Sequence, residues 1–138
     1  MQEKITALLV HNRPEPMGSI RRALECKFIE TQSVKTCGEA QQALSGRRPP
    51  HVVLTDPQLP DGSWEDVVRF ATEAPSSANV IVVSDVVDIA LYLESIQRGA
   101  FDFIVPPLPP TDLTYVVHSA FESALRRRET PLSIAARA

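Results

Sequence analysis

The residues best placed to do chemistry are polar side chains that directly follow apolar runs of the sequence. Asp56 is the most prominent, because it ends the run HVVLT at residues 51–55. Other runs end in His11, Asn12, Arg13, Ser84, Asp85, Pro106 and Pro107. A carboxylate at the end of a buried strand can act as a nucleophile or as a ligand for a cation. What Asp56 does therefore depends on which elements bring these side chains together.

Five short runs predict β-strands. They cover residues 5–10, 27–34, 51–55, 79–84 and 101–105. Four of them are almost uninterrupted Val, Ile and Leu, which is typical of parallel strands buried on both faces. Residues 27–34 alternate apolar and polar side chains and predict an edge strand.

Segments with helical spacing separate the runs. They predict helices over about 16–26, 38–46, 63–73 and 89–98, and from residue 111 to about 128. Asp88 and Thr111 are the expected N-caps of the last two helices. The last helix should bury Leu113, Val116, Val117, Ala120, Phe121 and Ala124. The repeated strand–helix order predicts a doubly wound α/β domain. In such sheets ligands bind beyond the carboxyl ends of the strands, where the polar residues above would gather.

Composition narrows the class of protein. The 138 residues are 43% hydrophobic and 22% charged, with a formal net charge of −3, which argues against a domain-wide nucleic-acid surface. No apolar run reaches membrane-spanning length and no secretory signal is recognised, so we expect a cytoplasmic protein in which Cys26 and Cys37 are ordinary thiols. The basic run at residues 126–128 is expected to be a solvated helix end.

Three motifs carry a resemblance to a known family. VVLTDPQLPDGS, VIVVS and GAFDFIVPPLPPTDL occur in the order found in receiver domains of two-component response regulators, and the chain resembles that family over residues 4–128. The resemblance implies a (βα)5 flavodoxin-like fold with a five-stranded parallel sheet in the order 2-1-3-4-5. Residues 1–128 would form the receiver domain. Residues 129–138 would be a C-terminal tail or the start of a linker to an output domain.

The resemblance also assigns roles to single residues. Asp56 matches the phosphorylated aspartate, and Ser84 matches the hydroxyl that turns toward the phosphoryl group. Phe103 matches the aromatic switch residue, and Gln58 matches the residue whose backbone carbonyl helps to bind Mg²⁺.

Two parts of the family's site do not carry over. His11 and Asn12 stand where the family has an acidic pair, and Pro106 stands where it has a lysine. Without these charges we expect weak or absent Mg²⁺ binding, no resident cofactor and inefficient phosphorylation of Asp56. Arg13 or His11 could supply a substitute cation, and Asp85 a second carboxylate.

A zinc site is not expected. His11, His51 and His118 lack the spacing of metal ligands, and the two thiols are not paired as Cys-x-x-Cys.

Function is then expected on a surface. On the helix at 89–98, Ile89, Tyr92, Leu93 and Ile96 form one stripe, taken as the buried one, which leaves Leu91 exposed. Tyr115 is expected to be exposed on the last helix. Receivers resembling this one dimerise, or meet output domains, through the fourth helix, fifth strand and fifth helix. Trp64 is either a further exposed anchor or a core residue.

These expectations describe an atypical receiver that is not an enzyme. It would act as an interaction and dimerisation module that controls an attached or partner output, for instance in transcription. A homodimer and a sensor kinase are the candidate partners, nucleic acid would be met only through an output domain, and no membrane is involved. One alternative is a working phosphorelay receiver phosphorylated on Asp56. A more remote one is a small flavodoxin-like enzyme or flavin binder, which the loop HNRPEPMGS disfavours because Arg and Pro replace the expected phosphate-cradling residues.

Overall fold

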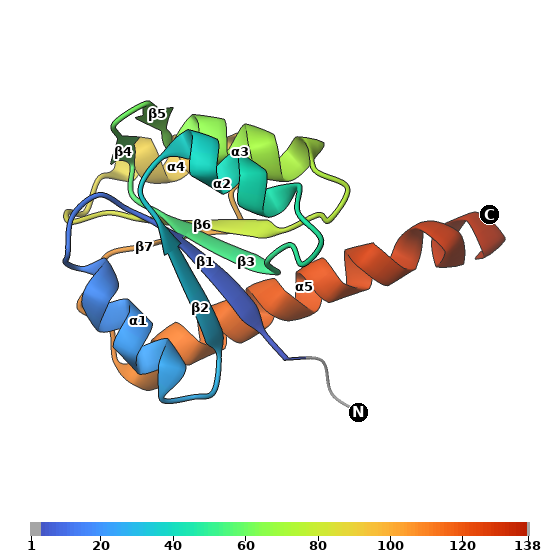
Figure 1. Cartoon of the computed structure of the whole chain (residues 1–138), viewed down its shortest axis with the longest axis horizontal. Helices are drawn as coiled ribbons and strands as arrows, with labels where there is room; N and C mark the ends of the chain where they lie inside the picture. Colours follow the sequence, from blue (N-terminus) through green and yellow to red (C-terminus); the bar gives the residue numbers. More distant parts are fainter. Residues whose placement is uncertain (1–3, 138) are drawn as a thin grey trace.

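The computed structural model describes residues 4–137, with side chains described as far as residue 128. Five parallel strands form one sheet in the order β2-β1-β3-β6-β7, which is the predicted flavodoxin-like order (Figure 1). Their bounds are β1 Thr6–Val10, β2 Glu30–Val34, β3 Val52–Thr55, β6 Asn79–Val83 and β7 Asp102–Ile104. The alternating run does form an edge strand, β2, and the fold class predicted from the sequence is confirmed.

Five helices cover the sheet on both faces. Their bounds are α1 Met17–Glu25, α2 Cys37–Leu44, α3 Trp64–Glu73, α4 Ile89–Gln97 and α5 Pro110–Arg137. Helices α1 and α5 lie on one face and α2, α3 and α4 on the other (Figure 1). Neighbouring strand residues such as Val53 and Leu54 pack into different clusters, since successive side chains point to opposite faces. Burial on both faces is why these strands are uninterrupted apolar runs.

Side-chain caps fix where several helices begin. Asp88 accepts a hydrogen bond from the backbone N–H of Leu91, as predicted. Ser63 and Asp66 form a reciprocal capping box at the start of α3. The predicted cap Thr111 is wrong, because α5 already begins at Pro110, where a proline has no N–H to leave unpaired. The predicted inner stripe of α5 does pack into the core.

Helix α4 is turned the opposite way from the prediction. Its stripe Ile89, Tyr92, Leu93 and Ile96 is exposed, whereas Leu91 is partly buried against the core cluster. The prediction that Leu91 faces solvent is therefore wrong. An apolar stripe of two turns predicts a buried face from its periodicity, but in α4 this stripe is the exposed face. Trp64 is buried, so its role is in the core.

A short hairpin that the sequence did not predict follows β3. Strands β4 Gln58–Leu59 and β5 Gly62–Ser63 pair in antiparallel fashion. Asp61 at the turn accepts hydrogen bonds from the backbone N–H groups of Cys37 (2.7 Å) and Gly38 (3.0 Å), which ties the hairpin to the start of α2. A Cβ at Gly62 would collide with the carboxylate of Asp66 and would lie 2.9 Å from the Cys37 sulfur.

Helix α5 is fastened to the N-terminal edge of the sheet by a set of polar contacts, the α5 clamp, made by Asn79, Arg127 and Arg128. Asn79 is buried and donates from Nδ2 to the carbonyl of Ala120 (2.8 Å), and its Oδ1 accepts from Arg127. Arg127 also donates to the carbonyl of Ser77 (2.8 Å). Arg128 donates to the carbonyls of Ser76 and Pro50. The prediction of a solvated helix end is thus wrong at these two arginines, because their guanidinium groups bind carbonyl oxygens and α5 continues past them.

Within residues 4–137 no helix combines the length and the apolar character that crossing a membrane requires.

Candidate functional site

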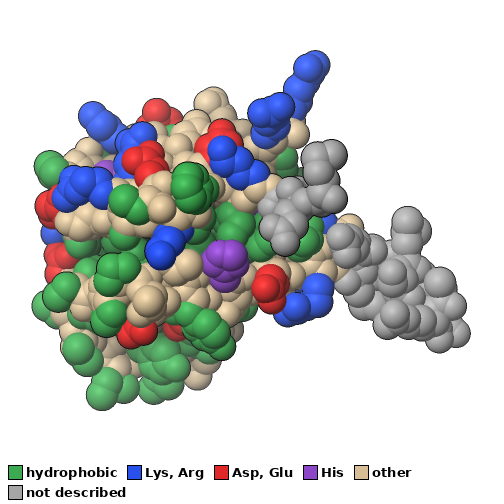
Figure 2. Space-filling model, turned by 90° about the horizontal axis from the view of Figure 1, so that it is seen from below, with side chains coloured by type: hydrophobic (Ala, Val, Ile, Leu, Met, Phe, Trp, Pro, Cys, Tyr) green, Lys and Arg blue, Asp and Glu red, His purple; other side chains and the backbone are tan. Residues whose placement is uncertain are grey.

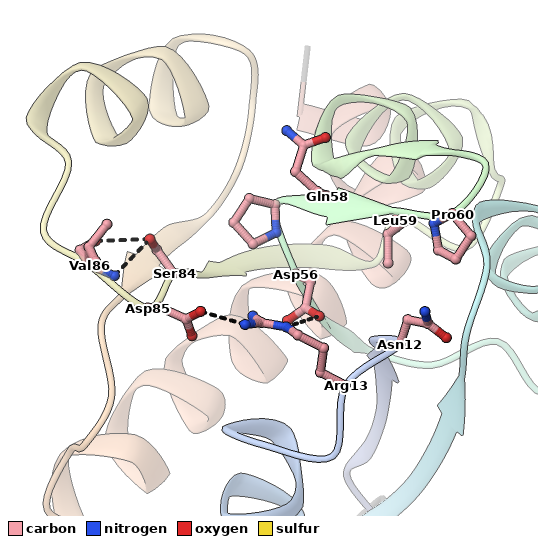
Figure 3. Close-up of a pocket in the computed structure, with 10 residues that line it drawn as sticks. Asn12, Arg13, Asp56, Gln58, Leu59, Pro60, Ser84, Asp85 and Val86 are labelled. Carbon is pink, nitrogen blue, oxygen red and sulfur yellow. Dashed lines mark hydrogen bonds and ion pairs between the residues drawn. The ribbon is translucent and has the colours of Figure 1, made fainter.

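Asp56 lies at the carboxyl edge of the sheet, at the bottom of a cavity of about 620 Å³. Its backbone N–H binds the carbonyl of Val10, which fixes it directly beyond β3. The residue is only 3% exposed. The cavity is lined by Asn12, Arg13, Asp56, Pro57, Gln58, Leu59, Pro60, Ser84, Asp85 and Val86 (Figure 3). The sheet thus brings together the ends of β1, β3 and β6, as the topology predicts.

Arg13 is the centre of the charge arrangement. Its guanidinium lies between two carboxylates, with Nη1 2.6 Å from Oδ2 of Asp85 and Nε 3.9 Å from Oδ2 of Asp56 (Figure 3). Of the two cations named from the sequence, Arg13 and His11, it is Arg13 that faces Asp56, and Asp85 lies on its other side. Oδ1 of Asp56 is buried and has no hydrogen-bond partner among the described residues.

Burial dominates the acidity of Asp56. Removal of the carboxylate from water raises the pKa of Asp56 above its usual value of 3.8, and the negative charge of Asp85 acts in the same direction. The positive charges of Arg13 and His11 oppose this rise without cancelling it. The short hydrogen bond to Asp85 raises the pKa of Arg13, so the guanidinium stays charged. The pocket therefore holds an internal cation that two acids share.

His11 and Pro106, two of the residues assigned to the site, lie outside the lining of this cavity. The His11 ring binds the carbonyl of Arg13 through Nδ1 (2.6 Å) and lies 3.4 Å from the Ser33 hydroxyl through Nε2. Pro106 lines a separate groove between α1 and the start of α5, and its peptide bond to Pro107 is cis. Asn12 and Gln58, in contrast, do line the cavity.

Ser84 lines the cavity and Phe103 does not, and the side chains of both are engaged in other contacts. The Ser84 hydroxyl donates to the carbonyl of Val86 (2.8 Å) and accepts from its N–H (3.2 Å), so it points along its own loop (Figure 3). Phe103 packs edge-on against Tyr92, with ring centroids 5.9 Å apart. No contact tests the switch roles assigned to these two residues, which stay predictions.

Sequence reasoning missed four residues of the lining: Pro57, Leu59, Pro60 and Val86. Pro57 directly follows Asp56, and Leu59 and Pro60 arrive with the β4–β5 hairpin, whose four strand residues are too short a signal for hydrophobic periodicity. Val86 is brought in by the local turn that Ser84 closes, for which the sequence offers only the adjacency of the two residues. Among the described residues, no group of three or more His, Cys, Asp or Glu is arranged to hold a metal ion.

Comparison with known proteins gives relatives of one kind. The chain is 28% identical over 128 residues to the photosynthetic apparatus regulatory protein RegA of Rhodovulum sulfidophilum, covering 92% of this chain and 69% of RegA. It is also 28% identical over 114 residues to the response regulator protein PilR of Pseudomonas aeruginosa, but this covers 83% of the chain and only 25% of PilR. No protein-family model matches the sequence.

Solved structures share the fold. The signal receiver domain of a LuxO repressor protein from Vibrio parahaemolyticus superposes with a TM-score of 0.81 at 23% identity, covering 94% of this chain and 98% of that one. The beryllofluoride-activated receiver domain dimer of NtrC4 gives a TM-score of 0.74 at 23% identity, covering 86% and 98%.

The chain shares its five-stranded parallel sheet with solved receiver domains, and an aspartate is buried at the end of its central strand. Its sequence is similar to response regulators over most of its length, which supports a receiver domain of that type. It spans about a quarter of PilR, so what lies beyond the domain in such proteins says nothing directly about this chain.

Proposed function

We propose that this domain is an atypical receiver that works without phosphorylation of Asp56, as a cytoplasmic interaction module rather than an enzyme. One observation carries the proposal: the guanidinium of Arg13 lies between Asp56 and Asp85, where it offsets part of their negative charge. Phosphoryl transfer to a carboxylate needs positive charge that is free to meet the incoming phosphoryl group. Here the available cation is already engaged by two carboxylates.

The donor set also fits Mg²⁺ poorly. Mg²⁺ prefers an octahedron of oxygen ligands that is anchored by one or two carboxylates. Oδ2 of Asp56 and Oδ2 of Asp85 both face the guanidinium of Arg13, and the His11 ring is bound to a backbone carbonyl. At the position of the family's lysine, Pro106 has no amine to offer.

An apolar surface on α4 and the preceding loop is the proposed contact site. This α4 surface is made of exposed hydrophobic side chains: Val86, Val87, Ile89, Tyr92, Leu93 and Ile96. Hydrophobic side chains gather at the lower left of the face that Figure 2 shows. Tyr115 on α5 is also exposed, as predicted. Contiguous apolar patches beyond a few hundred Å² are uncommon on monomers and mark contact sites.

A second copy of the chain is the occupant we propose. A stable dimer buries roughly 800 Å² per partner, and six large apolar side chains on one helix and its loop supply the core of such an interface. The NtrC4 receiver, which has this fold, is described as a dimer. The attached or partner output would be transcriptional, as in the relative named for transcriptional regulation of C4-dicarboxylate transport.

The phosphorylation question is tested by titrating the domain with beryllofluoride and Mg²⁺ and following ¹⁹F NMR. No saturable bound signal is expected, whereas an unphosphorylated receiver whose aspartate does accept phosphoryl groups should give one under the same conditions. A saturable signal that disappears in Asp56→Asn would refute the proposal. It would support the second candidate, a phosphorelay receiver, which the unpartnered buried Oδ1 of Asp56 favours.

The dimer is tested by sedimentation velocity across a concentration series. Leu93→Asp places a charge on the α4 surface and should weaken self-association at least tenfold, because it would bury an unpaired carboxylate at the interface. Phe28→Asp changes an equally apolar side chain that is exposed in the turn after α1, and serves as the matched control. Equal self-association in both variants would place the dimer contact elsewhere.

A further inference from the structure

The loop between β6 and α4 joins the Asp56 pocket to the α4 surface over very few residues. Ser84 is buried at the end of β6 and Asp85 reaches into the pocket, whereas Val86 and Val87 are 62% and 79% exposed. Asp88 then caps α4. Within four residues the chain therefore passes from the charged pocket to the beginning of the apolar surface.

Two restraints of different origin hold this loop. The first is local, because the Ser84 hydroxyl binds both the carbonyl and the N–H of Val86 and so closes a turn. The second comes from a residue 72 positions away, because Arg13 after β1 binds Asp85 at 2.6 Å. The local turn sets the shape of the loop, and the long-range ion pair ties the loop to the residues that follow β1.

The ion pair opposes the tendency of the two exposed valines, Val86 and Val87, to leave water. Exposed apolar side chains gain free energy when they leave water, so a loose loop would tend to fold Val86 and Val87 onto nearby surface. Asp85 directly precedes Val86, and its carboxylate is held by a guanidinium that is itself held toward the buried Asp56. A loop fixed at Asp85 and again at the Asp88 cap keeps the valines in line with the exposed face of α4.

We propose that Arg13 is a positioning residue for the contact surface: its ion pair with Asp85 holds the β6–α4 loop so that Val86 and Val87 extend the α4 surface toward the second copy. This inference rests on the proposed function for its partner, but the position of the loop can be measured without the dimer.

The test measures two quantities in each variant: amide hydrogen exchange of residues 84–91, recorded at concentrations where the chain is monomeric, and the dissociation constant of the dimer. Asp85→Asn keeps the size of the side chain and removes its charge. Arg13→Lys keeps the charge and loses the planar fork, and it leaves a cation beside the buried Asp56. The third variant combines the two substitutions.

Each single variant should speed exchange of residues 84–91 and raise the dissociation constant by roughly 2- to 5-fold, the range expected for losing a partly exposed ion pair. The double variant should be no worse than the stronger single one, because both substitutions break the same contact. Arg21→Gln and Glu25→Gln are the matched controls. Their ion pair is as exposed as Arg13–Asp85, at 46% and 49% against 52% and 49%, and lies on α1. Neither control should change either quantity.

The outcomes separate the two proposals. Unchanged exchange of residues 84–91 in Asp85→Asn would overturn the positioning role of Arg13, whatever the dimer does. Additive effects in the double variant would do the same, since the two residues would then act independently. Faster exchange together with an unchanged dissociation constant would overturn the link to the contact surface and leave the dimer standing. If Leu93→Asp also fails to weaken self-association, it is the proposed dimer face that is wrong.

Discussion

The α5 clamp allows a quantitative prediction, because one buried side chain, Asn79, both donates and accepts a hydrogen bond in it. Asn79 is 5% exposed, donates to the carbonyl of Ala120 and accepts from Arg127. Replacement by alanine removes both hydrogen bonds and leaves the Arg127 donor with its bond to Ser77. A neutral buried hydrogen bond contributes about 1 kcal/mol, and one to a charged donor about 1.5 kcal/mol at the low end that suits a solvent-edge arginine.

Asn79→Ala should therefore lower the free energy of unfolding by about 2–3 kcal/mol. For a domain of this length the melting temperature should fall by about 8 °C. Asn79→Asp should be at least as harmful, because it sets a carboxylate oxygen against the carbonyl of Ala120. Urea denaturation followed by fluorescence measures the loss directly, since Trp64 is the single tryptophan and is buried.

Arg126→Ala is the matched control. Arg126 is adjacent in sequence but exposed, and its replacement should change stability by less than about 0.5 kcal/mol. Arg127→Ala should fall between the control and Asn79→Ala. If Asn79→Ala and Arg126→Ala unfold at the same urea concentration, the clamp does not stabilise the docking of α5 and the reasoning is refuted.

Three further predictions concern single side chains. The pKa of Asp56 is raised in the folded state, so the folded state binds the proton more firmly, and stability is lost as pH rises from about 3.8 through the raised value. In urea denaturation, Asp56→Asn should therefore gain stability relative to the native chain between pH 4 and 7. A difference in stability that does not depend on pH would contradict this. Burial raises the pKa of the Cys37 thiol to about 11, whereas Cys26 is exposed. Iodoacetamide at pH 8 should therefore modify Cys26 alone. If the folded Cys26→Ser variant is still modified, Cys37 is accessible and the prediction is wrong. Leu91 packs against the core and Leu93 is exposed, so Leu91→Asp should destabilise the fold by about 2 kcal/mol and Leu93→Asp by less than about 0.5 kcal/mol. If thermal melts give the reverse order, α4 is oriented as the sequence predicted, with Leu93 buried.

The sheet could be predicted because each central strand is buried on both faces. In runs such as residues 79–84 both faces of the strand are buried, so apolar residues follow one another without alternation in the sequence. The position of Asp56 followed from the same logic, since the end of a parallel strand is an edge of the sheet whatever the loops do. Arg13 could be named as a candidate cation because it follows β1, the neighbour of β3.

The errors arose where periodicity carries too little information. A nine-residue helix that is apolar on its outer face can be turned either way, and only the packing of Leu91 against the core decides which. The basic run after residue 125 predicts a solvated helix end, but two of its arginines bind the backbone carbonyls of Pro50, Ser76 and Ser77. Every residue has a backbone carbonyl, so the sequence does not show which ones will bind an arginine. Which of the two cations would reach Asp56, Arg13 or His11, likewise depended on loop geometry.

The arginine between two carboxylates has a consequence for how such a domain stores information. A receiver that carries a phosphoryl group keeps a record of a past signal until the group is hydrolysed. On the function proposed here, Arg13 occupies the position between Asp56 and Asp85, and no phosphoryl group is stored there. On the function proposed here, the occupancy of the contact surface follows the present concentration of the protein and its partner. Control would then pass from a kinase to whatever sets the synthesis and turnover of the chain.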